Sequence, residues 1–147
     1  MDTIDSIFTR HSYRGRYTDQ AVPHEHLETI MQAGLAAPSG CIAVDDPELL
    51  ARLHTVIDPD VAESAPAMIF VLSRPIKAYR DRCFAVQDYG AAIENMLLAI
   101  HAPGYASCRY EGHITDDDRI CDKPAAIPGV PSACRCSGRT SESTAKG

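Results

Sequence analysis

Apolar residues recur at helical spacing in four segments of the chain. Residues 2–9 place Ile4, Ile7 and Phe8 on one face of a short helix. A second helix is predicted from His24 to Ala36, between Pro23 and Pro38, and a third begins with Pro47 at its first position. The longest periodic segment runs from Tyr79 to about Ala102. It is apolar around most of its circumference, which is typical of a helix inside a core or a subunit interface.

Strand patterns are fewer. Residues 67–72 form a continuous apolar run between Pro66 and Arg74-Pro75, which predicts a buried strand. Residues 105–110 are a candidate second strand, and Thr115 to Asp118 resemble a helix N-cap followed by acidic first-turn residues. The predicted fold class is therefore α+β, with more helices than strands.

The C-terminal part differs from the rest. Residues 131–147 contain no Ile, Leu, Met, Phe, Tyr or Val, so they bury too little apolar area to offset their ordering entropy. We expect one domain over residues 1–130 and a disordered tail over residues 131–147. Pro124 lies inside a helical pattern, where proline costs about 3 kcal/mol.

Composition, net charge and cysteine spacing argue against several classes of function. The net charge of −6 argues against nucleic acid or an anionic membrane as the main partner. No run of about 18 apolar residues is present, and the N-terminus lacks a signal-peptide pattern, so we expect a cytoplasmic protein. The six cysteines make no C-x-x-C pair, which favours reduced thiols. Cys134 and Cys136 alone are a poor zinc framework, and we expect no metal.

The first candidate site is Arg10-His11-Ser12-Tyr13-Arg14. At a helix end or tight turn, this spacing directs two guanidinium groups and a hydroxyl towards one point. Planar guanidinium groups bind phosphate oxygens in pairs, so the segment predicts a site for a phosphate monoester.

Two further segments follow in order. They are Ala36-Ala37-Pro38-Ser39-Gly40 and the helix around Asp88–Ala99, which runs on to Gly104–Cys108 and Tyr110-Glu111-Gly112. With Arg10–Arg14, they resemble the nitroreductase family of FMN-dependent oxidoreductases over roughly residues 3–130. The resemblance implies a nitroreductase-like α/β sandwich and an intertwined homodimer with FMN at the interface. It implies ping-pong electron transfer from NAD(P)H through FMN to a small nitroaromatic, quinone or similar acceptor.

The resemblance also implies roles for individual residues. Arg10, Ser12 and Arg14 would hold the FMN phosphate and ribityl chain, and His11 would contribute mainly backbone. The segment Pro38, Ser39 and Gly40 would pass along the isoalloxazine from the other subunit. Glu111 and Gly112 would form the loop beside the flavin face, where a backbone N–H reaches N5. Hydride transfer needs no side-chain acid or base here, so no catalytic residue is named.

The chain departs from the family pattern in two places. A short segment that includes an Asn is missing after Gly40, and residues 132–147 replace the family's hydrophobic end. We expect an incomplete sheet, because a lost central strand leaves backbone groups unpaired. One alternative is therefore a truncated, non-catalytic family member that no longer retains FMN. Another is a phosphate- or nucleotide-binding module that uses Arg10 and Arg14 without redox chemistry.

Overall fold

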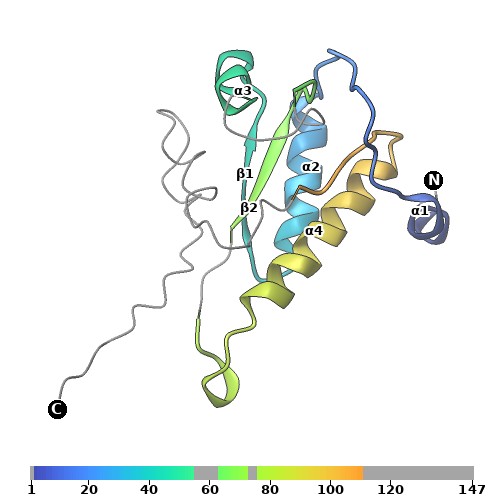
Figure 1. Ribbon diagram of the computed structural model, residues 1–147. Coiled ribbons are helices and arrows are strands. Elements are labelled where there is room, and N and C mark those ends of the chain that lie inside the picture. The colour runs from blue at the N-terminus through green and yellow to red at the C-terminus, as the bar shows by residue number, and fades with distance from the viewer. Residues whose placement is uncertain (1, 55–62, 73–75, 111–147) are drawn as a thin grey trace.

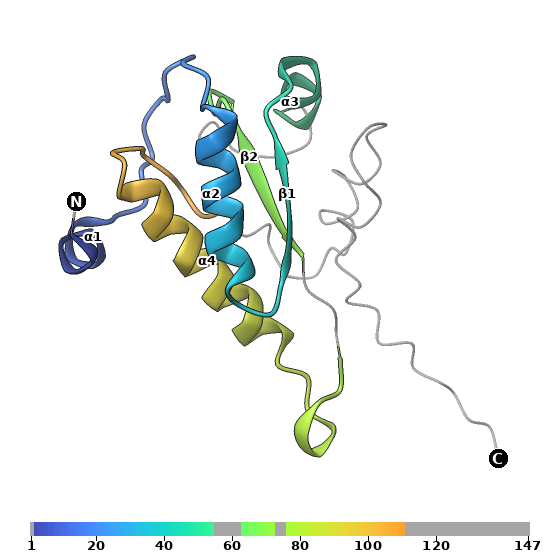
Figure 2. The same ribbon diagram turned by 180° about the vertical axis from the view of Figure 1, so that it is seen from behind.

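The computed structural model describes residues 2–54, 63–72 and 76–110. Two long helices, α2 (His24–Leu35) and α4 (Ala85–His101), lie side by side against one face of a small sheet (Figures 1 and 2). The short helix α1 (Thr3–Thr9) lies beside α4 on the side away from the sheet, and α3 (Pro47–His54) lies near one end of the strands. This mixture of helices and an open sheet confirms the α+β prediction.

The described sheet has two antiparallel strands, β1 (Gly40–Val44) and β2 (Met68–Leu72). Gly40 pairs with Leu72 and Val44 with Met68, so all five positions are matched. We expected an incomplete sheet because of the segment missing after Gly40. In the described residues the sheet is small and open, and Gly40–Val44 provides the strand that pairs with β2.

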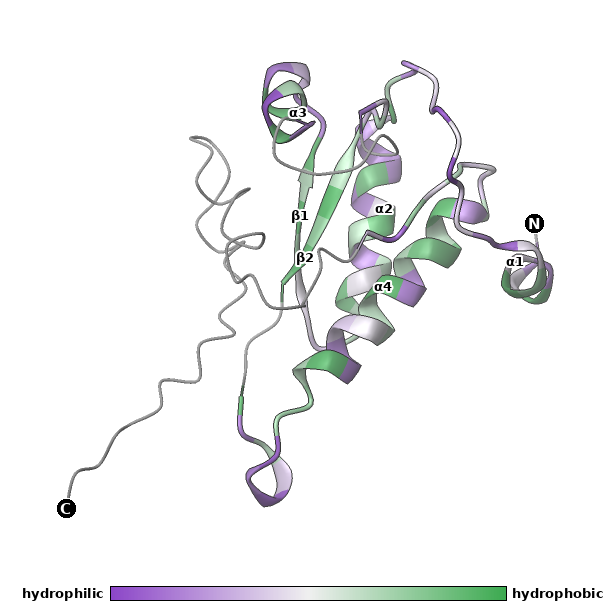
Figure 3. Ribbon diagram, in the orientation of Figure 1, coloured by the Kyte–Doolittle hydropathy of each residue, from purple (hydrophilic) through white to green (hydrophobic). Residues whose placement is uncertain are grey.

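Apolar residues line the interior of this arrangement. Hydrophobic colours run along both strands and along much of α4 (Figure 3). Val44, Leu50 and Leu53 form a cluster between β1 and α3. The buried residues of the two long helices are Leu27, Ile30 and Gly34 on α2 and Ala92, Met96 and Leu97 on α4. The two helices pack against each other, with Gly34 against Met96.

The first three helices match their predicted positions, but the fourth starts late. Residues 79–81 form one 3₁₀ turn in which Arg80 and Asp81 have positive φ, and α4 begins only at Ala85. Positive φ is unfavourable in L-residues and interrupts helical hydrogen bonding, so the periodic pattern over 79–84 does not become helix. A bridge between Lys77 and Cys83 closes this loop instead.

Other predictions have different outcomes. The candidate strand over residues 105–110 is wrong, because only Ser107 makes a single bridge, to Ser12. Residues 115–118, Pro124 and the predicted tail over 131–147 lie outside the described residues. In the described ranges, no helix combines the length and apolar character needed to cross a bilayer.

The face of α1 that carries Ile4, Ile7 and Phe8 is exposed in the single chain. Phe8 is 82% exposed, whereas Ser6 is the residue that packs inward. The predicted amphipathic helix therefore forms, but its apolar face has no described partner within one copy.

Candidate functional site

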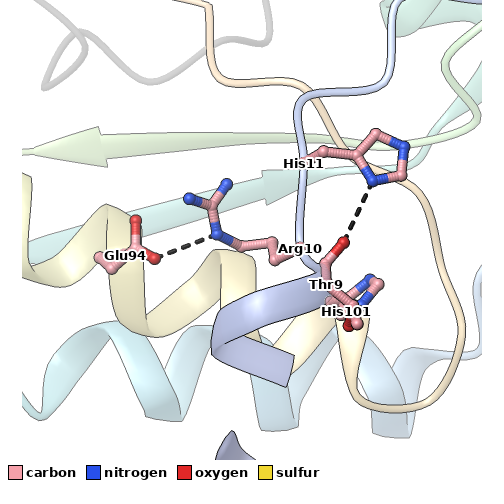
Figure 4. A network of polar contacts seen from close by, with 5 residues as sticks. All are labelled: Thr9, Arg10, His11, Glu94 and His101. Carbon is pink, nitrogen blue, oxygen red and sulfur yellow. Dashed lines mark hydrogen bonds and ion pairs between the residues drawn. The ribbon is translucent and has the colours of Figure 1, made fainter. Parts of the chain in front are cut away.

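Arg10 lies where α1 ends and an extended segment begins. Asp2 caps the start of α1 by accepting a hydrogen bond from Ile4 N at 2.8 Å, and Arg10 N donates to Ser6 O at 3.0 Å at its end. The Arg10 side chain reaches α4, where its Nε lies 3.0 Å from Glu94 Oε1 (Figure 4). The first arginine of the predicted phosphate motif is thus held between two helices.

A second contact joins α1 to α4. Thr9 Oγ1 lies 2.9 Å from His101 Nε2, and Thr9 Oγ1 also donates to Asp5 O at 2.6 Å. Glu94 and His101 are seven residues apart on α4, which places them on the same face of the helix. Figure 4 shows both residues of α4 beside the segment Thr9–His11.

The extended segment continues along residues 104–108. Ser12 bridges to Ser107 in parallel orientation, and Tyr13 N donates to Ser107 O at 2.8 Å. Residues 104–108 are in turn attached to α2, because Tyr105 Oη lies 2.7 Å from His26 Nδ1 and the two rings are in edge contact. The N-terminal motif is therefore fixed by backbone pairing to a loop that α2 anchors.

A cavity of about 310 Å³ opens between these elements. Its lining comes from the motif, from the end of α4 and from the loop that follows: Arg10, His11, Tyr13, His101, Gly104, Tyr105, Ala106 and Ser107. A guanidinium, two imidazoles and the Ser107 hydroxyl are donors suited to an anion. The backbone N–H groups of Tyr13, Gly104 and Tyr105 already donate to carbonyl oxygens. The volume is at the small end of ligand sites, roughly 300–1,000 Å³. These residues fit a phosphate group.

The other predicted residues lie elsewhere in the single chain. Arg14 is exposed, makes no ion pair with a described residue and does not line the cavity. Pro38, Ser39 and Gly40 follow the C-terminal end of α2, whereas His26, which holds the cavity loop, is near its N-terminal end. The 12-residue helix separates the two groups by about 18 Å. Ser39 Oγ donates within this corner to Gly34 O at 3.0 Å.

Glu111 and Gly112 lie outside the described residues. In the sequence they follow directly after Tyr110, shortly beyond Ser107, the last lining residue of the cavity. Their predicted position beside the flavin remains a prediction.

Burial raises the pKa of two groups, one close to the motif and one on β1. The pKa of Tyr17 is raised to about 12, mainly because burial disfavours the phenolate and then because Cys108 and Tyr13 lie nearby. Burial also raises the pKa of the Cys41 thiol on β1, which makes it a poor nucleophile at neutral pH. Cys41, Cys83 and Cys108 are free thiols, and in the described part of the chain no cluster of His, Cys, Asp or Glu could hold a metal.

Sequence reasoning missed several lining residues. His101, Tyr105 and Ser107 were not predicted for the site, and Glu94 was assigned only to the long helix. Arg10 and Glu94 are 84 positions apart, so no local pattern connects them. Glu94 and His101 are polar residues at heptad spacing on a largely apolar helix, but Asp88 and Asn95 share this spacing, so the pattern does not single them out.

Comparison with known proteins identifies the family of the chain. The sequence model of the nitroreductase family matches residues 7–43 and 42–134, which together cover most of the chain. A protein of Methanothermobacter thermautotrophicus is 30% identical over 128 residues, covering 82% of this chain. It is named "Putative NADH dehydrogenase/NAD(P)H nitroreductase". The chain therefore belongs to the nitroreductase family.

Solved structures agree with the fold. A structure of the same name from Bacteroides thetaiotaomicron has a TM-score of 0.71 at 22% identity, covering 87% of this chain and 79% of that one. A nitroreductase from Bacteroides fragilis, solved with bound FMN, has a TM-score of 0.61 at 27% identity. That comparison covers 90% of this chain and 82% of the other.

The chain is shorter than its relatives. It spans 65% of the length of the archaeal protein that it matches. The two segments of the family match also meet at residues 42–43, inside β1. This break lies where the sequence predicted a missing segment, and it supports a deletion beside the strand.

Proposed function

We propose that the protein is an FMN-dependent oxidoreductase that passes electrons from NAD(P)H to a small acceptor such as a nitroaromatic or a quinone. The observation that carries the proposal is the cavity in which Arg10 and His11 meet His101 and Ser107. It supplies donors for a phosphate at the position of the family's first motif. When bound, FMN would supply the hydride and electron chemistry.

The residues of the chain would bind and orient this group. Arg10 would pair with phosphate oxygens, and Arg14 and Ser12 would contact the phosphate or ribityl chain from the extended segment. Backbone pairing of Ser12 and Tyr13 with Ser107 would keep this segment rigid. Glu111 and Gly112 would lie beside the flavin ring.

A homodimer is part of the proposal. Pro38, Ser39 and Gly40 lie at the end of α2 that is remote from the cavity, so they would reach an isoalloxazine only from a second copy. Exposed apolar side chains support such an interface, because Ile4, Ile7 and Phe8 share one face of α1. The expected cytoplasmic location belongs to the same proposal.

Anaerobic reduction tests the proposed reaction. The chain is loaded with FMN, free flavin is removed, and NADH or NADPH is added without oxygen. The proposal predicts that the visible flavin band bleaches and that a quinone restores it. A bound flavin that neither nucleotide bleaches would contradict the proposed activity.

A second function is favoured by the break in the family match. A truncated, non-catalytic family member that no longer retains FMN would fit a chain whose match is interrupted at residues 42–43, inside β1. Circular dichroism separates this case from simple unfolding. A helical, folded chain that never retains FMN would support it.

A further inference from the structure

Glu94 contacts Arg10 in a way that leaves the phosphate-binding end of the arginine uncommitted. The bond joins one carboxylate oxygen, Oε1, to Nε at 3.0 Å. Among the described residues, no hydrogen bond engages the two Nη atoms of Arg10. In Figure 4 one of these nitrogens lies on the Glu94 side of the guanidinium and the other is directed away from Glu94. A guanidinium held through Nε still presents both Nη groups as a planar pair of donors.

The ion pair between Arg10 and Glu94 contributes little to the stability of the fold. The Arg10 side chain is 24% exposed and that of Glu94 is 51% exposed. Pairs exposed to this degree contribute little to folding because water screens them and both side chains lose freedom. The main consequence of the contact is therefore the direction in which it holds Arg10.

The position of Glu94 on α4 also suits it to orient Arg10. It does not line the cavity, whereas Arg10 and His101 do. His101 holds Thr9 two helical turns further along the same face. Thr9 and Arg10 are therefore fixed to α4 at two points, one through the end of α1 and one through the guanidinium.

We infer that Glu94 is a positioning residue that orients Arg10 so that its Nη groups point towards a phosphate in the cavity. The inference rests on the proposed FMN-binding function and adds a residue to it. The hydrogen bond to Oε1 matters more than the negative charge, because a carboxylate beside an anion site opposes binding by like-charge repulsion. A neutral acceptor at position 94 should therefore serve at least as well.

The test compares FMN with riboflavin, which lacks the phosphate. Dissociation constants are measured by flavin fluorescence for the wild-type chain, Glu94→Ala, Glu94→Gln and Arg10→Ala. Asp88→Ala, an acidic residue on the same helix without a contact to Arg10, is the matched control. Glu94→Ala should weaken FMN binding by about fivefold, the value of one modest hydrogen bond, and leave riboflavin binding unchanged. Glu94→Gln should bind FMN as tightly as the wild type or more tightly.

Each alternative result of these titrations shows whether the positioning role of Glu94 or the proposed phosphate site fails. Tighter FMN binding in both Glu94 variants would show that Glu94 competes with the phosphate, and equal losses for FMN and riboflavin would show a merely structural role. Either result overturns the inference. An unchanged Glu94→Ala beside a weakened Arg10→Ala overturns the positioning role and leaves the proposed phosphate site intact. A wild-type chain that binds no FMN, or an Arg10→Ala variant that binds it normally, overturns both.

Discussion

Gly34 of α2 packs directly against Met96 of α4, with no room for a side chain between them. A Cβ at position 34 would collide with Met96 Cε and would lie 2.9 Å from its Cγ. Met96 is only 4% exposed, so it has little space to move. This contact sets the closest approach of the two helices, and α4 in turn holds Arg10 and the cavity.

Substitution of Gly34 by Ala should therefore destabilise the protein. Alanine gains up to about 1 kcal/mol in helix propensity, but overpacking in a core costs about 1–3 kcal/mol. We expect a net loss of about 1 kcal/mol in the free energy of unfolding, measured by urea denaturation. Gly90→Ala on α4 is the matched control, because a Cβ there meets nothing within 4 Å. It should stabilise the protein, and a Gly34→Ala variant as stable as Gly90→Ala would disprove the close contact.

The hydroxyl of Tyr105 holds the cavity loop on α2. Tyr105→Phe keeps the ring contact with His26 and removes only the 2.7 Å hydrogen bond. The free energy of unfolding should fall by about 1 kcal/mol. Tyr79→Phe, at an exposed position, should change it by less than about 0.5 kcal/mol. Equal effects of the two substitutions would show that the hydrogen bond does not form in solution.

Tyr17 should make stability depend on alkaline pH. Its pKa is about 12 in the folded chain against 10.0 for an ordinary tyrosine, so the unfolded chain loses this proton first. The contribution of Tyr17 is complete below pH 10 and declines as the pH rises towards about 12. Urea midpoints should fall more steeply over this range for the wild type than for Tyr17→Phe. Parallel declines in the two proteins would contradict the raised pKa.

Arg14 should affect ligand binding without affecting the fold. It is exposed and makes no ion pair with a described residue, so Arg14→Ala should change the free energy of unfolding by less than about 0.5 kcal/mol. Loss of one charge-assisted hydrogen bond should raise the dissociation constant for FMN by about tenfold or more. An unchanged constant, measured by the same fluorescence titration, would remove Arg14 from the site.

Local patterns predicted much of the fold. Pro23 and Pro38 bounded α2, Pro47 marked the start of α3, and the apolar run before Arg74-Pro75 became β2. Gly40–Val44 was not recognised as a strand, because its identity depends on pairing with β2. The paired residues, such as Cys41 and Val71, are too far apart in the sequence for a local pattern to connect them. The helix expected from Tyr79 failed over its first six residues because Arg80 and Asp81 adopt positive φ.

The candidate site was also predicted only in part, because local patterns do not show which distant residues meet. Arg10 and His11 line the cavity as a contiguous motif would suggest. His101 and Tyr105 line it, and Glu94 contacts Arg10, only through the packing of α1, α2 and α4. Such contacts join residues 79 to 92 positions apart, and no spacing rule connects them.

The most direct test of the account is retention of FMN. The purified chain and its Arg10→Ala variant are incubated with FMN, passed through a desalting column and compared by the ratio of flavin to protein absorbance. The account predicts that the wild-type chain retains the flavin band and that Arg10→Ala, with an unchanged circular dichroism spectrum, loses most of it. A wild-type chain that is folded but emerges colourless would contradict the account, and the family relationship would then describe ancestry without a flavin site.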